Sequence, residues 1–416
     1  MQSLNRLFLY LLPLMPFVGY VNSKVTGVYV GYVIGFISVI ITIANVMTSK
    51  SNLKLPKYLF VYLLFVIYSI FIQYYKSLVV SPIQFFGTNS IVFSFFLLFV
   101  IENTVYTEEY IKKYYRFLKI TVLFAVLTAI IQLFISKEFF IDIYASGNTS
   151  FRFLYSDFGR IPNIQTYSGG MGIFLLTFSS IVIFSYFNQK IYLFRERKII
   201  IVIYLALVGF VIIVGQTRWI MVAYLIVLFQ FVIYRKNIFS GFMTNLVYIF
   251  LISILIYGSL RLFDYDIDKL LQDRIIQSGK TLEDNTGYSR IKAYTYFSEF
   301  FPDNPLLGTG ETMSYKIKSA VHTQIHVGWL SAFLYFGLIG GFLFVFSFYL
   351  LGKDILKYAK AWNQYFVFFV FMVYVWANFT LVYIHFLEWG FLVALVFYNF
   401  QKQRYVMNTL PNVLKV

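Results

Sequence analysis

The amino-acid sequence predicts an all-α integral membrane protein, and three observations lead to that fold class. Of the 416 residues, 60% are hydrophobic and 12% are charged, and the mean hydropathy of +0.74 is far too high for an ordinary soluble domain. Apolar runs of about 20 residues recur along the chain, and each is long enough to cross a hydrocarbon core of about 30 Å. These runs lack the polar–apolar alternation of membrane β-strands. We therefore expect a bundle of transmembrane helices.

Polar breaks divide the apolar sequence into about twelve candidate spans. In chain order these are residues 6–22, 25–47, 57–75, 84–101, 117–135, 166–187, 198–215, 219–234, 243–262, 326–350, 364–383 and 386–400. The first run lacks a small-residue cleavage site and is followed at once by another span, so we interpret it as a retained helix. Residues 1–416 are thus expected to form a single polytopic membrane domain.

The distribution of charge predicts the orientation. With a cytoplasmic N-terminus, most of the 34 Lys and Arg residues fall in cytoplasmic loops, and most of the 18 Asp and Glu residues fall outside. Both termini are therefore expected in the cytoplasm. Orientation accounts for most of the net charge of +16, so no nucleic-acid partner is expected.

Two outside segments, residues 136–165 and 263–325, are too long to be simple connectors. Residues 268–279 and 288–301 of the second segment have the pattern of short amphipathic helices, and Gly279 closes the first of them. The sequence predicts a large helical extracytoplasmic loop near 263–325, inserted within the membrane domain.

Arginines near the outer ends of the spans are candidates for binding. Arg218 lies where spans seven and eight meet, and a charge at that depth faces a cavity or partner unless it snorkels to the interface. Arg290 opens the 288–301 segment, and Gly308 and Gly310 bracket a turn further on; a solvated loop charge is the alternative interpretation of Arg290. Arginines can grip the oxygens of a diphosphate and stabilise its charge as it leaves.

Two histidines four residues apart, His322 and His326, precede the 326–350 span. A histidine with a pKa near 6.5 can take a proton from an attacking hydroxyl at neutral pH. With the arginines, this residue set favours phosphate-linked group transfer on the outer face.

Two metal sites are weaker alternatives. The HTQIH spacing lacks the Glu of the H-E-x-x-H zinc motif. Asp264, Asp266 and Asp268 resemble the Asp-x-Asp pattern of some sugar transferases but fail the calcium-loop pattern, and a solvated acidic cluster is the simpler interpretation. No metal or other cofactor is expected, and the acidic cluster is left open.

At these residues the chain resembles the O-antigen polymerase and O-antigen ligase superfamily of bacterial envelope enzymes. HVGWLSAFLYFGLIG, at 326–340, fits the family's H-[NSQ]-x9-G-x-x-G pattern in His326, Gly337 and Gly340. Val327 departs from the pattern, because a small amide or hydroxyl residue usually follows the histidine.

Three further segments carry the resemblance. SRIKAYTYFSEFFPDNPLLGTG, at 289–310, is similar to the family's Arg, helix and P-L-x-G-x-G loop. QTRWI, at 216–220, is similar to its T-x-S-R segment, and GRIPNIQTYSGG, at 159–170, to its Arg-Pro-Asn entry to a span. The first five spans match in hydropathy alone.

The resemblance implies transfer of a glycan from a polyprenyl diphosphate to an acceptor hydroxyl, without a nucleotide sugar or metal. It implies that Arg218 and Arg290 meet the diphosphate and that His326 orients or deprotonates the acceptor. The expected substrate-binding residues are Arg160, Tyr288, Gly308, Gly310 and His322.

The leading functional hypothesis is polymerisation of surface-polysaccharide repeat units, such as O-antigen or capsule, in the bacterial inner membrane. The chain is rich in Phe (50) and Tyr (36) and its motifs are degenerate, two features of the more divergent polymerases. The alternatives are an O-antigen ligase, which delivers the glycan to a lipid A core or a protein, and a lipid-linked oligosaccharide flippase. Expected partners are the lipid-linked oligosaccharide donor and acceptor, the lipid bilayer and a chain-length regulator protein.

Overall fold

The computed structural model describes twelve stretches of the chain, and all structural statements below concern these residues. They are residues 1–18, 30–48, 53–76, 90–135, 168–187, 196–215, 218–230, 254–258, 285–310, 327–362, 364–379 and 388–409.

Every regular element in the described part of the chain is a helix, which confirms the all-α class there. The elements are α1 (Gln2–Leu9), η1 (Leu12–Leu14), α2 (Met15–Val18), α4 (Val30–Thr48), α5 (Lys57–Tyr75), α7 (Ser90–Asn103), α8 (Glu108–Phe134), α11 (Ser168–Phe187), α12 (Lys198–Val214), α13 (Arg218–Leu228), α17 (Asn285–Phe300), α19 (Gly328–Trp362), α20 (Phe366–Ala377) and α21 (Trp389–Thr409). Among the described helices, α4, α5, α8 and α19 are long and apolar enough to cross a membrane by length and composition. The total of about twelve spans stays a prediction.

The first predicted span, residues 6–22, is not one continuous helix over its described part. A 3-10 turn, η1, separates α1 from α2, with Pro13 inside that turn and Pro16 just after it. Proline removes a backbone donor and clashes with the preceding turn, which accounts for the interruption.

Helix α11 lies at the centre of the bundle. Every described side chain from residue 171 to residue 185 is buried, and α11 packs against α12, α13, α20 and α21. Helices at the rim instead expose apolar side chains, such as Ile40 of α4, Ile67 of α5 and Ile120 of α8, each more than half exposed. Rim surfaces of this kind suit contact with lipid.

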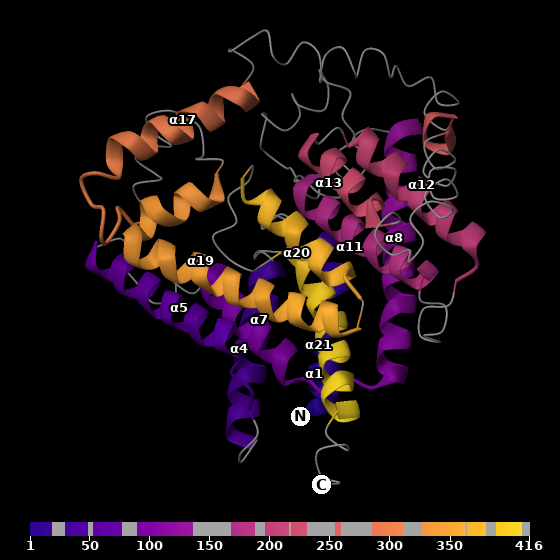
Figure 1. Ribbon diagram of the computed structural model, residues 1–416, viewed down its shortest axis with the longest axis horizontal. Coiled ribbons are helices and arrows are strands. Elements are labelled where there is room, and N and C mark those ends of the chain that lie inside the picture. Colours follow the sequence, from indigo (N-terminus) through magenta and orange to yellow (C-terminus); the bar gives the residue numbers. More distant parts are fainter. Residues whose placement is uncertain are drawn as a thin grey trace.

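The start of the chain and the end of α4 lie at the same end of the bundle. The amides of Asn5 and Asn45 are hydrogen-bonded, which puts the end of α4 beside the start of the chain. Figure 1 shows α1 and the end of α21 at one end of the bundle and α17 at the other. We call these the terminal end and the α17 end. Which of them faces the cytoplasm stays a prediction.

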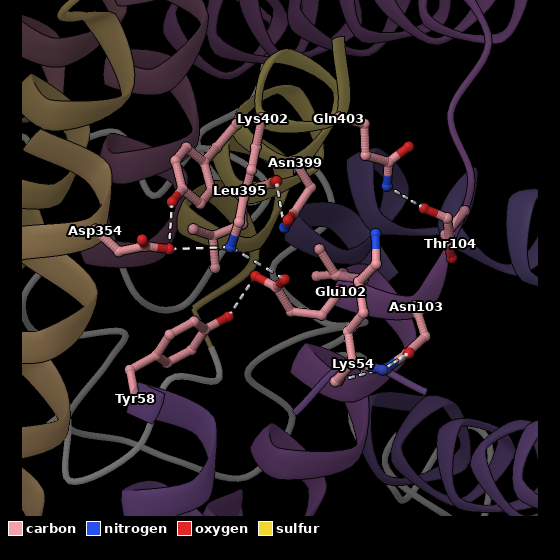
Figure 2. A network of polar contacts seen from close by, with 12 residues as sticks. Lys54, Tyr58, Glu102, Asn103, Thr104, Asp354, Leu395, Asn399, Lys402 and Gln403 are labelled. Atoms are coloured by element: carbon pink, nitrogen blue, oxygen red, sulfur yellow. Dashed lines mark hydrogen bonds and ion pairs between the residues drawn. The ribbon is translucent and has the colours of Figure 1, made fainter. Parts of the chain in front are cut away.

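A network of buried and partly buried polar groups links four helices at the terminal end (Figure 2). The ammonium of Lys402 lies 3.0 Å from Asp354 Oδ2 and 3.6 Å from Glu102 Oε2. The hydroxyl of Tyr58 donates to Glu102 Oε1 (2.7 Å), and that of Tyr398 donates to Asp354 Oδ2 (2.7 Å). The network thereby joins α5, α7, α19 and α21.

The loop between α7 and α8 is held from both sides at the same end. Arg6 Nε of α1 donates to the Val105 carbonyl (2.7 Å), and the Val105 amide donates to Gln2 Oε1 (2.8 Å). From α21, Gln403 Nε2 donates to the Thr104 carbonyl (2.6 Å). The first and last described helices are therefore fixed to one short loop.

Helix α19 is broken, so the prediction of one continuous span over 326–350 is wrong. Gly337 has non-helical dihedrals (φ 63°, ψ −168°). The ring centroids of Trp329 and Phe348 lie 5.2 Å apart, whereas 19 residues of continuous helix would separate them by about 28 Å along the axis. The rings of Phe333 and Phe342 pair in the same way at 5.6 Å.

Residues 328–336 therefore fold back, antiparallel, on the limb that starts at residue 338. We call the two limbs the α19 hairpin. The ring of Phe65, from α5, contacts both limbs, with centroids 5.3 Å from Phe336 and 5.3 Å from Phe344. The absence of a side chain at Gly341 leaves room for the Phe333 ring.

Candidate functional site

The bend of the α19 hairpin is completed by the NPLLGTG loop, residues 304–310. A break in a membrane helix frees backbone groups that lipid cannot satisfy, so protein must supply their partners. Here residues 305–310 pair with residues 334–339 on both sides of Gly337. The backbone bonds are Thr309 N to Leu334 O (2.9 Å), Gly310 N to Tyr335 O (2.9 Å), Leu338 N to Pro305 O (2.8 Å) and Ile339 N to Leu306 O (3.4 Å).

Glycine is required on both sides of this junction. Gly308 and Gly337 have positive φ angles of 78° and 63°, a region that side chains disfavour. A Cβ on Gly308 would overlap the backbone nitrogen of Gly337, and a Cβ on Gly337 would overlap the carbonyl oxygen of Leu306. The predicted turn at Gly308 and Gly310 is thus a loop that docks on α19, and it contacts Gly337 of the 326–340 motif there.

Helix α5 fixes the same loop from a third side. Lys76 Nζ donates to Asn304 Oδ1 (2.8 Å), and the Tyr68 hydroxyl donates to the Leu306 carbonyl (3.4 Å). Tyr68 also packs where a side chain on Gly340 would project, so both motif glycines of α19 lie at this junction.

Helix α17 confirms the predicted helix over 288–301 and leads into the loop. It packs against α19, and Ala293 within it is fully buried. By helical periodicity, position 290 shares the face that carries Ala293 and Phe297. The side chains of Arg290 and Tyr288 lie outside the described part, so their contacts stay predictions.

The end of α20 lies beside the start of α19. Helix α20 packs against α11, α13, α19 and α21. The amide of Gly328, the first residue of α19, donates to the carbonyl of Asn378, the residue after α20 (2.9 Å). His326 precedes Gly328 by two residues and itself lies outside the described residues.

The starts of α13 and α21 lie at one level along α11. Space left by Gly172 of α11 is filled by Ile220, two residues after Arg218, and Gly390 of α21 lies against the backbone of Phe174. The hydroxyl of Thr177 donates to the Gly390 carbonyl (3.1 Å), which fixes that register. The backbone of Arg218 is therefore placed at the level where α21 begins.

Two buried polar side chains at these helix ends were missed by the sequence analysis. Asn378 and Glu388 are fully buried. Asn378 Nδ2 donates to the Tyr374 carbonyl (3.2 Å), and Glu388 Oε2 accepts from the Phe391 amide (2.9 Å) and caps α21. Both residues fall inside predicted spans, where polar side chains usually have a functional role, and that signal could have identified them.

Several predicted site residues cannot be compared with this geometry. Arg160, His322, His326 and the acidic cluster of Asp264, Asp266 and Asp268 lie outside the described residues, as does the side chain of Arg218. The structure thus gives backbone positions for Arg218, Tyr288 and Arg290, and full positions for Gly308 and Gly310.

Comparison with known families gives one match, over residues 203–345, to the model described as O-antigen ligase. The matched segment includes α13, α17, the NPLLGTG loop and the bend of the α19 hairpin. No curated protein matches the chain. The match confirms, over those residues, the resemblance to the O-antigen polymerase and ligase superfamily of membrane glycosyltransferase-like enzymes.

Proposed function

We propose that the protein polymerises surface-polysaccharide repeat units on the outer face of the bacterial cytoplasmic membrane. The observation that carries the proposal is the junction between the NPLLGTG loop and Gly337, within the segment that matches the O-antigen ligase family. This junction ties α17, which carries Arg290, to the helix that follows His326. Two of the three residues proposed for catalysis thus belong to chain segments that lead into this junction.

In the proposed reaction, the donor is a glycan joined to a polyprenyl diphosphate. A hydroxyl oxygen of the acceptor sugar attacks the anomeric carbon, and the bond from that carbon to the diphosphate oxygen breaks. The polyprenyl diphosphate leaves with the electron pair, stabilised by Arg218 and Arg290. The hydroxyl proton passes to His326.

A ligase is the second candidate, because the matching family model is described as O-antigen ligase. A ligase would use the same donor and the same three residues, and would deliver the glycan to a lipid A core or a protein. The degenerate motifs and the abundance of Phe and Tyr support the polymerase.

The test is a reconstitution of the purified protein in lipid nanodiscs with one defined lipid-linked repeat unit. Formation of lipid-linked dimers and longer chains is the expected result. Transfer only to an added lipid A core would identify a ligase. No transfer to either acceptor, with a folded protein, would contradict the proposal.

A further inference from the structure

Two buried hydrogen-bond acceptors at the ends of α20 and α21 have no partner among the described residues. Asn378 uses its amide nitrogen on the Tyr374 carbonyl, but its Oδ1 accepts no hydrogen bond. Glu388 uses Oε2 to cap α21, but its Oε1 accepts none. Leaving a buried acceptor unpaired costs stability, so each such group calls for an explanation.

The two side chains lie at one level of the bundle. The rings of Tyr374 and Phe391 stack with centroids 4.7 Å apart, which sets the register of α20 against α21. From this pair, one turn along α20 reaches Asn378, and one turn back along α21 reaches Glu388. Both residues therefore lie where α20 ends and α21 begins.

The same corner adjoins the start of α19. The Asn378 carbonyl accepts from the Gly328 amide, and the indole of Trp329 lies 6.2 Å from the Phe379 ring. Val327 is buried and apolar, so the side chain that follows His326 supplies no hydrogen bond. Among the described residues, the unpaired polar groups near this corner are the Trp329 indole nitrogen of α19 and the acceptors of Asn378 and Glu388 at the ends of α20 and α21.

The chemistry of the pair selects its ligand. An amide oxygen and a carboxyl oxygen both accept hydrogen bonds, and neither side chain carries the positive charge that would hold a diphosphate. The pair suits a neutral ligand rich in donors, and aromatic rings beside such acceptors are the surroundings that sugar rings favour. Hydroxyl groups of a glycan meet both conditions.

We infer that Asn378 and Glu388 form a subsite for the hydroxyl groups of the acceptor sugar, separate from the arginines that hold the donor diphosphate. The inference rests on the proposed function and deepens it, because it says which substrate meets these helix ends. The Asn378 carbonyl accepts from Gly328, which follows His326 by two residues in the chain, and on this ground the subsite is assigned to the acceptor, whose hydroxyl gives its proton to His326 in the proposed reaction.

The experiment measures binding of two probes to the full-length protein in nanodiscs. The methyl glycoside of the host's own repeat unit has no diphosphate leaving group, so it can act only as an acceptor. Polyprenyl diphosphate has no glycan, so it reports the donor site. The variants are Asn378→Leu and Glu388→Gln, which keep the size of each side chain.

Each variant is expected to weaken glycoside binding about tenfold, the effect of losing one hydrogen bond to a bound ligand, and to change polyprenyl diphosphate binding less than about twofold. Asn378→Leu should also keep or raise the thermal midpoint, because it removes an unpaired buried acceptor. A residue that only supports the fold would lower the midpoint and weaken both probes together.

Gln364→Leu is the matched control. Gln364 is buried, has an unpaired Oε1 among the described residues, and precedes α20 at the terminal end. This variant should leave both probes unchanged.

The outcomes separate the subsite from the proposed function. Unchanged glycoside binding in both variants, or equal weakening of the two probes, overturns the subsite. If the subsite is overturned but the wild-type protein still elongates a lipid-linked repeat, the proposed function stands. If the wild-type protein binds neither probe and elongates nothing, the proposed function and the subsite are both contradicted.

Discussion

Gly308 and Gly337 meet backbone to backbone, 29 positions apart in the chain, at the bend of the α19 hairpin. Each has a positive φ, and neither leaves room for a methyl group. The loop and the helix are thus one structural unit at this point.

Replacing Gly337 with alanine should destabilise the protein by about 2 kcal/mol or more, because the backbone conformation disfavours a side chain and the new methyl group overlaps the Leu306 carbonyl. The measurement is the thermal midpoint in detergent. Gly258→Ala is the control, since a Cβ there meets nothing within 4 Å. Equal midpoints for the two variants would contradict the described junction.

A cysteine pair tests the α19 hairpin directly, and the natural chain contains no cysteine to interfere. Phe333→Cys with Phe342→Cys should form a disulfide under mild oxidation, because the two rings lie 5.6 Å apart. Mobility on a non-reducing gel after proteolysis in the 334–341 bend would detect it. Phe342→Cys with Leu351→Cys has the same nine-residue spacing within one limb and should not cross-link, since nine helical residues span about 13 Å. Cross-linking of the control pair alone would refute the hairpin.

Lys402→Met should lower the free energy of unfolding by about 2–3 kcal/mol, because Glu102 and Asp354 would lose their shared cation in a mostly buried setting. Denaturant titration of the two proteins provides the comparison. Lys113→Met, which removes a fully exposed pair with Glu109, should have no measurable effect. Adding Glu102→Gln to Lys402→Met should restore part of the loss. An unchanged free energy of unfolding in Lys402→Met would show that the network contributes little to stability.

His326→Ala and Arg290→Ala should each leave cells with single lipid-linked repeats and no long polysaccharide, with membrane insertion intact. His322→Ala should be much milder, because the proposed mechanism gives the proton to His326 alone. Gel ladders of extracted polysaccharide provide the readout. Normal ladders in the first two variants would contradict the assignment, and equal loss at both histidines would favour a metal pair.

Hydropathy predicted the all-α class and the positions of many helices. Most described helices overlap a predicted apolar run, as α5 (Lys57–Tyr75) does with 57–75 and α12 (Lys198–Val214) with 198–215, whereas α17 lies in the predicted outer loop. Chemistry local to each segment determines such features, so they can be recognised in a single sequence. The bend at Gly337 could not be, because its cause is a loop about 30 residues earlier that satisfies the freed backbone groups.

Of the candidate site, the sequence predicted the residues that belong to local motifs and missed those brought together only by the fold. Gly308, Gly310 and Gly337 stand out as motif glycines, and the structure explains their spacing as one contact. Asn378 and Glu388 belong to no motif, and their interest arises only from burial and from helix ends that meet in three dimensions. From the sequence alone, a search for polar residues within the predicted apolar spans would have come nearest to identifying them.

The bend at Gly337 also bears on how the chain enters the membrane during synthesis. Residues 328–336 would extend about 13 Å as a helix, less than half of a 30 Å hydrocarbon core, so they cannot be retained as a span when they leave the translocon. They gain a stable position only when the limb from residue 338 has inserted and the NPLLGTG loop, already synthesised, docks on the bend. Insertion of this part of the chain is thus completed by folding, and docking of the NPLLGTG loop on the bend is its last step.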